Sequence, residues 1–166
     1  MEVDFDGAGS NSPVTYEDFT AGWNAAVGAE NTLNTTVKLL ADWTAAEGSF
    51  GTGTGFQNGT VAGFICIPVG KTVNLDLNGH IIDRNLEEAQ ADGSVIQVLG
   101  TLMLTDSGTT GKITGGNDAS TMGAAGGVQI AKNGTFIMNG GIICGNASTA
   151  NYNTGGGGVC NKGTFI

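Results

Sequence analysis

Positive charge is scarce in this chain of 166 residues, which has six lysine and arginine residues against 15 aspartates and glutamates. The formal net charge is −9. Nucleic acids and anionic membrane surfaces are bound mainly through lysine and arginine, so this balance argues against both as partners. The chain also lacks any run of about 20 apolar residues, so we predict no membrane insertion by this segment.

A signal peptide is also missing, because the N-terminus has no basic region followed by an apolar one. The chain is therefore either cytosolic, or part of an exported protein whose signal was removed or is not included. The repeats described below lead us to favour the exported protein.

Proline is rare, with two residues, whereas glycine reaches 30. That is far above the usual glycine share of about 7%. The glycines do not follow the three-residue period of collagen. They stand beside short apolar triplets instead, which predicts many tight turns rather than disorder.

The first part of the chain predicts a leader and one helix. Residues 1–14 are acidic and rich in Gly, Ser and Asn, so we expect a flexible leader. Thr15 with Asp18 three residues later resembles a capping box, and Gly28 is a plausible stop. A capping helix is therefore predicted over residues 15–28. Its apolar face consists of Phe19, Trp23, Ala26 and Val27.

A strand-like run over residues 36–43 and a long Gly/Thr/Asn segment to residue 63 follow the helix. We interpret residues 36–63 as a first coil with its loop. The helix should cover the open end of this coil, with Phe19 and Trp23 shielding Val37 and Leu39.

From Ile65 onward the sequence repeats itself. An apolar–polar–apolar triplet begins at Ile65, Ile96, Val128 and Val159, so it recurs every 31 or 32 residues. A second landmark, threonine followed by an alternating triplet, begins at Thr72, Thr101, Thr135 and Thr164. A third landmark matches residues 78–85 to residues 139–146, with a weaker copy at 111–117. Each unit therefore holds three short strands and no helical period.

This pattern predicts an all-β fold, a β-solenoid with about 31 residues per coil. Ankyrin and tetratricopeptide repeats have similar lengths, but each of their units needs two amphipathic helices. We predict a single domain over residues 15–166, with repeat coils over 64–166 that break off within the fourth coil. Strand alternation places one apolar set inside: Ile65, Ile67, Val73, Leu75, Ile82, Ile96, Val98, Leu102, Leu104, Ile113, Val128, Ile130, Phe136, Met138 and Ile143.

Two further expectations concern the edges of the stack. Insertions fall at one place per coil, at residues 86–94, 118–126 and 147–157, and should project from one edge. The chain stops inside a strand at Ile166. Because solenoids normally carry a terminal cap, we expect the N-terminal fragment of a longer array, with further coils in the same parent chain.

The strings Gly126-Gly127-Val128-Gln129-Ile130 and Phe136-Ile137-Met138-Asn139 resemble the repeats of polymorphic outer-membrane proteins and autotransporter-like adhesins. Residues 134–146 resemble the Gly/Thr/Asn-rich surface repeats of gut Gram-positive bacteria even more closely. The resemblance covers roughly residues 15–166. It implies a pectin-lyase-like, right-handed parallel β-helix exposed at the cell surface or secreted, with a host or cell-surface glycan or protein as partner.

Enzymes on this fold attack polysaccharides with clustered carboxylates, or with Ca²⁺ and a basic residue. The candidates here are Asp76, Asp83, Arg84, Asp106 and His80. As a catalytic site, Asp83 and Arg84 would form a lyase or hydrolase centre at the corner after the third strand. The alternative is a solvated corner pair that adds little stability. Asp76 lies four residues after its landmark threonine and Asp106 lies five after its own, so the two should not share a column.

The remaining motifs predict no cofactor and no metal site. Residues 51–55, Gly-Thr-Gly-Thr-Gly, lack the following helix of a nucleotide-binding loop. The three cysteines lack metal-ligand spacing. Cys66 and Cys160 should share a column but lie three rungs apart, which is too far for a disulfide. Met103 and Ile137 should share the outward column of Asn74, either packed under the projecting loops or a neighbouring domain, or exposed as an apolar patch for a partner.

We therefore expect a non-enzymatic, cell-surface or secreted repeat segment that acts as an adhesin or structural module of a larger bacterial protein. The alternative is a fragment of a polysaccharide-active β-helix enzyme, a lyase or a glycoside hydrolase. A carboxylate cluster in further coils would favour the enzyme, and more repeats that end in an anchor would favour the adhesin.

Overall fold

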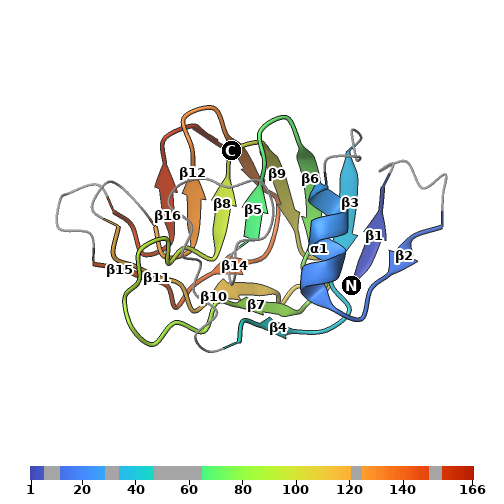
Figure 1. The fold of residues 1–166 in the computed structure, drawn as a ribbon, viewed down its shortest axis with the longest axis horizontal. Coiled ribbons are helices and arrows are strands. Elements are labelled where there is room, and N and C mark those ends of the chain that lie inside the picture. Colours follow the sequence, from blue (N-terminus) through green and yellow to red (C-terminus); the bar gives the residue numbers. More distant parts are fainter. Residues whose placement is uncertain (6–11, 29–33, 47–64, 121–124, 150–154) are drawn as a thin grey trace.

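The computed structural model describes residues 1–5, 12–28, 34–46, 65–120, 125–149 and 155–166. These residues form 17 β-strands and one helix, so the predicted all-β class is confirmed. The strands are short, and most pair in parallel with a strand about 31 residues away. Figure 1 shows them stepping along the long axis of the molecule, from the blue N-terminal end to the red C-terminal end.

Three sheets contain one strand from each repeat. A four-stranded sheet has the order β16 (Val159–Asn161), β12 (Val128–Ile130), β8 (Ile96–Val98), β5 (Ile65–Ile67). A second has the order β14 (Ile142–Ile143), β10 (Lys112–Thr114), β7 (Ile81–Asp83), β4 (Trp43–Thr44). The seven-stranded sheet has the order β17 (Thr164–Phe165), β13 (Thr135–Met138), β9 (Thr101–Thr105), β6 (Thr72–Asp76), β3 (Thr35–Lys38), β1 (Glu2–Asp4), β2 (Val14–Thr15).

The predicted register is confirmed in all three sheets. The triplets that begin at Ile65, Ile96, Val128 and Val159 pair in one column. The four landmark threonines pair in another. The weak landmark at residues 111–117 also holds, because β10 pairs with both β7 and β14.

The core consists of the inward side chains of these columns. All fifteen predicted inward residues belong to the apolar cluster, although Met138 and Ile143 are only partly buried. The middle residues of β5, β8 and β12 are buried as well, namely Cys66, Gln97 and Gln129. Alternation alone would place these three side chains outside, so other parts of the chain must cover the outer face of this sheet.

The helix α1 spans Phe19–Val27, and its N-cap is Asp18 rather than the predicted Thr15. The Asp18 carboxylate accepts a hydrogen bond from Ala21 N at 2.6 Å, and Thr15 instead belongs to the edge strand β2. Phe19 stacks on Trp43 with ring centroids 4.4 Å apart. The Trp23 indole donates to the Cys66 carbonyl at 3.3 Å. Both aromatic residues share one cluster with Val37 and Leu39, as the predicted cap requires.

The expectation of a flexible leader over residues 1–14 is wrong for its described ends. Strand β1 pairs antiparallel with β3 on one side and with β2 on the other. Val3 lies opposite Val37 and is fully buried. The alternation of Glu2, Val3 and Asp4 therefore adds one apolar residue to the core and closes the edge of the seven-stranded sheet.

The described parts of the insertions lie together on one edge, as predicted, and pair with one another. Strand β11 (Asn117–Asp118) pairs in parallel with β15 (Ala147–Ser148), and Gln90 forms a bridge with Asp118. The insertions therefore continue the repeat as a short ladder of their own.

Candidate functional site

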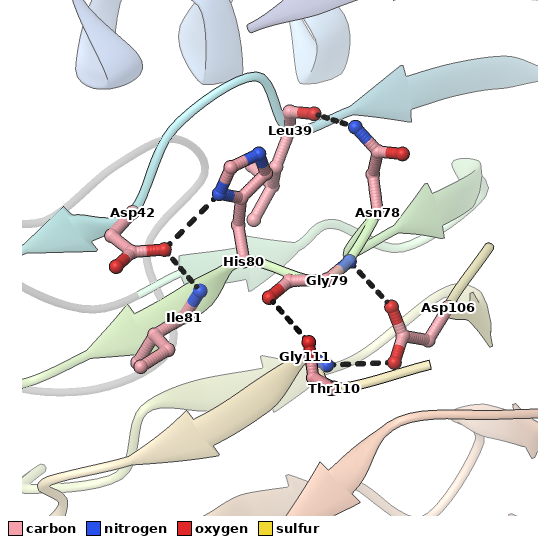
Figure 2. Close-up of polar contacts among 9 residues, drawn as sticks. All are labelled: Leu39, Asp42, Asn78, Gly79, His80, Ile81, Asp106, Thr110 and Gly111. Atoms are coloured by element: carbon pink, nitrogen blue, oxygen red, sulfur yellow. Dashed lines mark hydrogen bonds and ion pairs between the residues drawn. The ribbon is translucent and has the colours of Figure 1, made fainter. Parts of the chain in front are cut away.

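Polar side chains gather at the turns that join the seven-stranded sheet to the β4–β7–β10–β14 sheet (Figure 2). We call this region the polar corner. It consists of Asp42, Asp76, Asn78, His80, Asp106 and Ser107. Three sequence-predicted candidates therefore meet here, namely Asp76, His80 and Asp106. Asp76 pairs in register with Thr105, so the prediction that Asp76 and Asp106 do not share a column is confirmed.

The Asp76 carboxylate holds the turns of two successive coils. One oxygen accepts hydrogen bonds from Asn78 N and Ser107 N, both at 2.9 Å, and the other accepts from Ser107 Oγ at 2.7 Å. Burial alone would raise the pKa of Asp76. The bonds from Ser107 and Asn78, with the nearby Lys38 ammonium, outweigh that effect and lower the pKa.

Asp106 links the same two coils in the opposite direction. Its Oδ1 accepts from Gly79 N in the preceding coil, and its Oδ2 accepts from Gly111 N across its own turn, both at 2.7 Å. Gly79 has a φ of +82°, a left-handed conformation that glycine adopts without strain. Each carboxylate oxygen of Asp106 therefore holds one backbone N–H, as Figure 2 shows.

Asp42 and His80 contact each other, with Asp42 Oδ1 3.1 Å from His80 Nδ1, and the contact is an ion pair when the imidazole is protonated. The same oxygen accepts from Ile81 N at 3.0 Å. The backbone bond from Ile81, followed by the contact with His80, lowers the pKa of Asp42. Sequence reasoning missed Asp42. The sequence could have predicted its position, because aligning the strand at Trp43 with the strand at Ile82 places Asp42 beside Ile81.

An open groove of about 330 Å³ lies beside the polar corner. We call it the corner groove. It is lined by Asp42, Gly79, Ile81, Thr109, Thr110, Lys112 and Ile142. Its lining comes from four successive rungs of the stack, so the groove runs along the stack rather than within one coil. No sequence motif pointed to it.

Asp83 and Arg84 lie at the far end of β7, away from the polar corner. Asp83 accepts a hydrogen bond from Asn85 N at 2.8 Å. Arg84 is only 2% exposed, and burial lowers its pKa to about 10. The expectation of a solvated pair is therefore wrong for Arg84, because a side chain this deeply buried has lost its contact with water. A buried guanidinium is also poorly placed to meet a polysaccharide.

Asp92 and Asp118 form a pair of neighbouring carboxylates at the insertions, and the sequence analysis did not single out either residue. Asp118 is fully buried and accepts from Ser120 N at 2.6 Å and Ser94 Oγ at 3.3 Å. Burial, followed by the charge of Asp118, raises the pKa of Asp92. In the described part of the chain no three His, Cys, Asp or Glu residues come together to hold a metal ion.

The other candidates are placed as follows. Cys66, Cys144 and Cys160 are thiols rather than disulfides, and burial raises the pKa of Cys66 to about 11. Cys66 and Cys160 share one column, as predicted. Met103 and Ile137 share the column of Asn74 and are half-buried. Residues 51–55 lie outside the described residues.

No protein-family model, curated protein or solved structure matches this chain. Across the described ranges no helix reaches the length and apolarity needed to cross a membrane. The function must therefore be argued from the polar corner and the corner groove themselves.

Proposed function

We propose that this chain is a right-handed parallel β-helix that acts as a non-enzymatic structural and binding module at a bacterial cell surface or outside the cell. The β-helix is supported by the three sheets, because successive strands occupy each sheet in turn and pair with the equivalent strand of the next repeat. Right-handedness is expected because connections between parallel strands of one sheet are right-handed in about 98% of cases.

The observation that carries the functional proposal is the use of the carboxylates at the polar corner. Asp42, Asp76 and Asp106 each accept at least one backbone N–H from a neighbouring coil, at a turn or at the start of a strand. A general acid for glycoside cleavage needs a raised pKa and a carboxyl group that can reach the substrate. The pKa values of Asp42 and Asp76 are shifted the other way. Asp42, Asp76 and Asp106 therefore serve to hold neighbouring coils together, and the pKa shifts of Asp42 and Asp76 do not suit a general acid.

The module would contribute rigidity and a regular surface. The resemblance to Gly/Thr/Asn-rich surface repeats supports a place at the cell surface, and a host or cell-surface glycan or protein is the partner class that fits such a place. The acidic balance of six cationic to 15 anionic side chains favours a neutral or cationic partner over an anionic one.

The proposal is tested by incubating the purified protein with pectate, alginate and xylan, with and without Ca²⁺. Product is followed by the absorbance of unsaturated ends and by reducing ends. We expect no turnover. Turnover that disappears in the Asp83→Asn or Arg84→Ala variants would establish an enzyme centre at the end of β7. Biolayer interferometry against immobilised neutral glycans and mucin-type glycoproteins then measures binding, and failure to bind any of them contradicts the adhesin half of the proposal.

A further inference from the structure

The corner groove has the volume of a small-ligand site. Its volume of about 330 Å³ lies at the lower end of the range for such sites, roughly 300–1,000 Å³. Ile81, Lys112 and Ile142 stand in register in one column of three rungs. Neighbouring rungs are about 4.8 Å apart, so this column extends over about 10 Å, the length of up to about three extended amino-acid residues.

A fixed carboxylate stands at one end of the groove. Asp42 is held through Oδ1 by Ile81 N and His80 Nδ1 (Figure 2), and its side chain is 60% exposed. Its second oxygen accepts no hydrogen bond from any described residue, and Figure 2 shows this oxygen turned away from His80 and Ile81. The carboxylate is therefore oriented by the fold and still able to accept a donor.

A lysine occupies the middle position of this column. Lys112 lies between Ile81 and Ile142 on the neighbouring strands. No carboxylate of the described residues forms an ion pair with its ammonium group. Asp42 and Lys112 therefore line one groove without pairing with each other, and two aliphatic side chains flank the cation.

The rim of the groove carries a strained residue. Thr109 has a φ of +71°, a conformation that is costly for a β-branched side chain. Such strain tends to persist at ligand sites, where the surrounding structure holds it in place. Thr110 is fixed beside it, because its Oγ1 donates to the Gly79 carbonyl at 3.2 Å. The rim therefore offers two threonines in a preset arrangement.

We propose that the corner groove binds a zwitterion with an aliphatic body, either an apolar α-amino acid or a short apolar peptide with free ends. Its ammonium group would meet Asp42, its carboxylate would meet Lys112, and its aliphatic part would lie on Ile81 and Ile142. A simple anion would meet Asp42 and a chain of net charge −9, whereas a zwitterion brings both charges. Among the described residues that line the groove, a sugar ring would find no aromatic side chain to stack on. This site requires no cell surface, so it stands independently of the function proposed above.

The test is an NMR titration of the ¹⁵N-labelled 166-residue protein with leucine, Leu-Leu, N-acetylleucine and leucinamide. Leucine or Leu-Leu should shift the amide signals of Ile81, Lys112 and Thr110. Blocking either charged end should weaken binding at least about tenfold, since each end loses a charge-assisted contact. The tighter of leucine and Leu-Leu identifies the source as free amino acid or peptide.

Two variants assign the ends. In Asp42→Asn the ammonium group has lost its partner, so leucine and N-acetylleucine should differ in affinity by less than about twofold. In Lys112→Met the carboxylate has lost its partner, so leucine and leucinamide should differ by less than about twofold. Glu87→Gln and Lys132→Met remove the same charges from exposed positions outside the groove and should leave the affinity unchanged. Glucose and galacturonate are titrated as well. The proposal is overturned if no ligand shifts the groove signals, if blocked and free ligands bind equally, or if only one of these sugars binds.

Discussion

Removing the Asp106 carboxylate tests the idea that the polar corner fastens coils together. Asp106→Ala leaves Gly79 N and Gly111 N without the acceptors that lie 2.7 Å away. A hydrogen bond to a charged group contributes about 1.5–3 kcal/mol, so two give roughly 3–6 kcal/mol. Asp106 is only half-buried, and water can replace part of each bond. We therefore expect a loss of about 2–3 kcal/mol in the free energy of unfolding.

The assay is urea unfolding followed by the fluorescence of Trp23 and Trp43 and by far-ultraviolet circular dichroism, with thermal unfolding as a second measure. For a domain of this length, a loss of about 2–3 kcal/mol lowers Tm by roughly 5–10 °C. Asp106→Asn keeps one acceptor oxygen and should lose about half as much.

Asp83→Ala is the matched control. It also removes a carboxylate at the C-terminal end of a strand, but that carboxylate accepts only one exposed backbone bond among those described, from Asn85 N. We expect a loss below about 1 kcal/mol. If Asp106→Ala changes the unfolding free energy by no more than Asp83→Ala does, the polar corner does not fasten the coils. Asp106 would then be open to a role in binding or catalysis.

Three further predictions test the core, the cap and the insertions. Phe136 is fully buried, and its ring centroid lies 5.2 Å from that of Phe165. Phe136→Ala should therefore lower the free energy of unfolding by about 3–5 kcal/mol, and Phe136→Asp should prevent folding. A soluble Phe136→Asp variant with unchanged melting would show that Phe136 is not in the core. Deleting residues 1–30 uncovers β3 and should cause end-to-end association, and a stable monomer by light scattering would contradict this. Because the pKa of Asp92 is raised in the folded protein, its ionisation costs stability as pH rises above the unfolded value of about 3.9. Asp92→Asn should therefore raise Tm relative to the parent at pH 7 and not at pH 3, and an equal shift at both pH values would exclude a charge effect.

The register of the sheets could be read from the sequence because it rests on alternation and on landmarks that recur at nearly constant intervals. Ile96 and Val128 stack where the triplets predict, since a shift of one residue would turn each apolar column outward. Strand β1 could not be predicted in this way. It contributes one apolar residue, Val3, and its partner Val37 lies far along the chain, so no local pattern separates it from a polar leader.

The site was predictable only in part. His80, Asp76 and Asp106 stood out as candidates because charged residues are rare in the repeats. Their roles depend on which backbone N–H groups face them, and a sequence does not show that. The burial of Arg84 was missed for a similar reason, because solvation of a corner residue depends on what the neighbouring segments cover.

The corner groove arises because successive repeats keep their strands in register while the segments that connect these strands differ in length. The segments from the seven-stranded sheet to the next sheet are residues 39–42, 77–80, 106–111 and 139–141, so the corner at residues 106–111 is the longest. Its flanking strands β9 and β10 still keep register with both neighbours. Asp106 ties the start of this corner to Gly79 in the preceding coil and to Gly111 at its own end. The surplus residues can then only project outward, which leaves Thr109 exposed at a positive φ beside Lys112. In a stack whose repeats are otherwise alike, recognition of a ligand is therefore expected where a repeat departs from its neighbours.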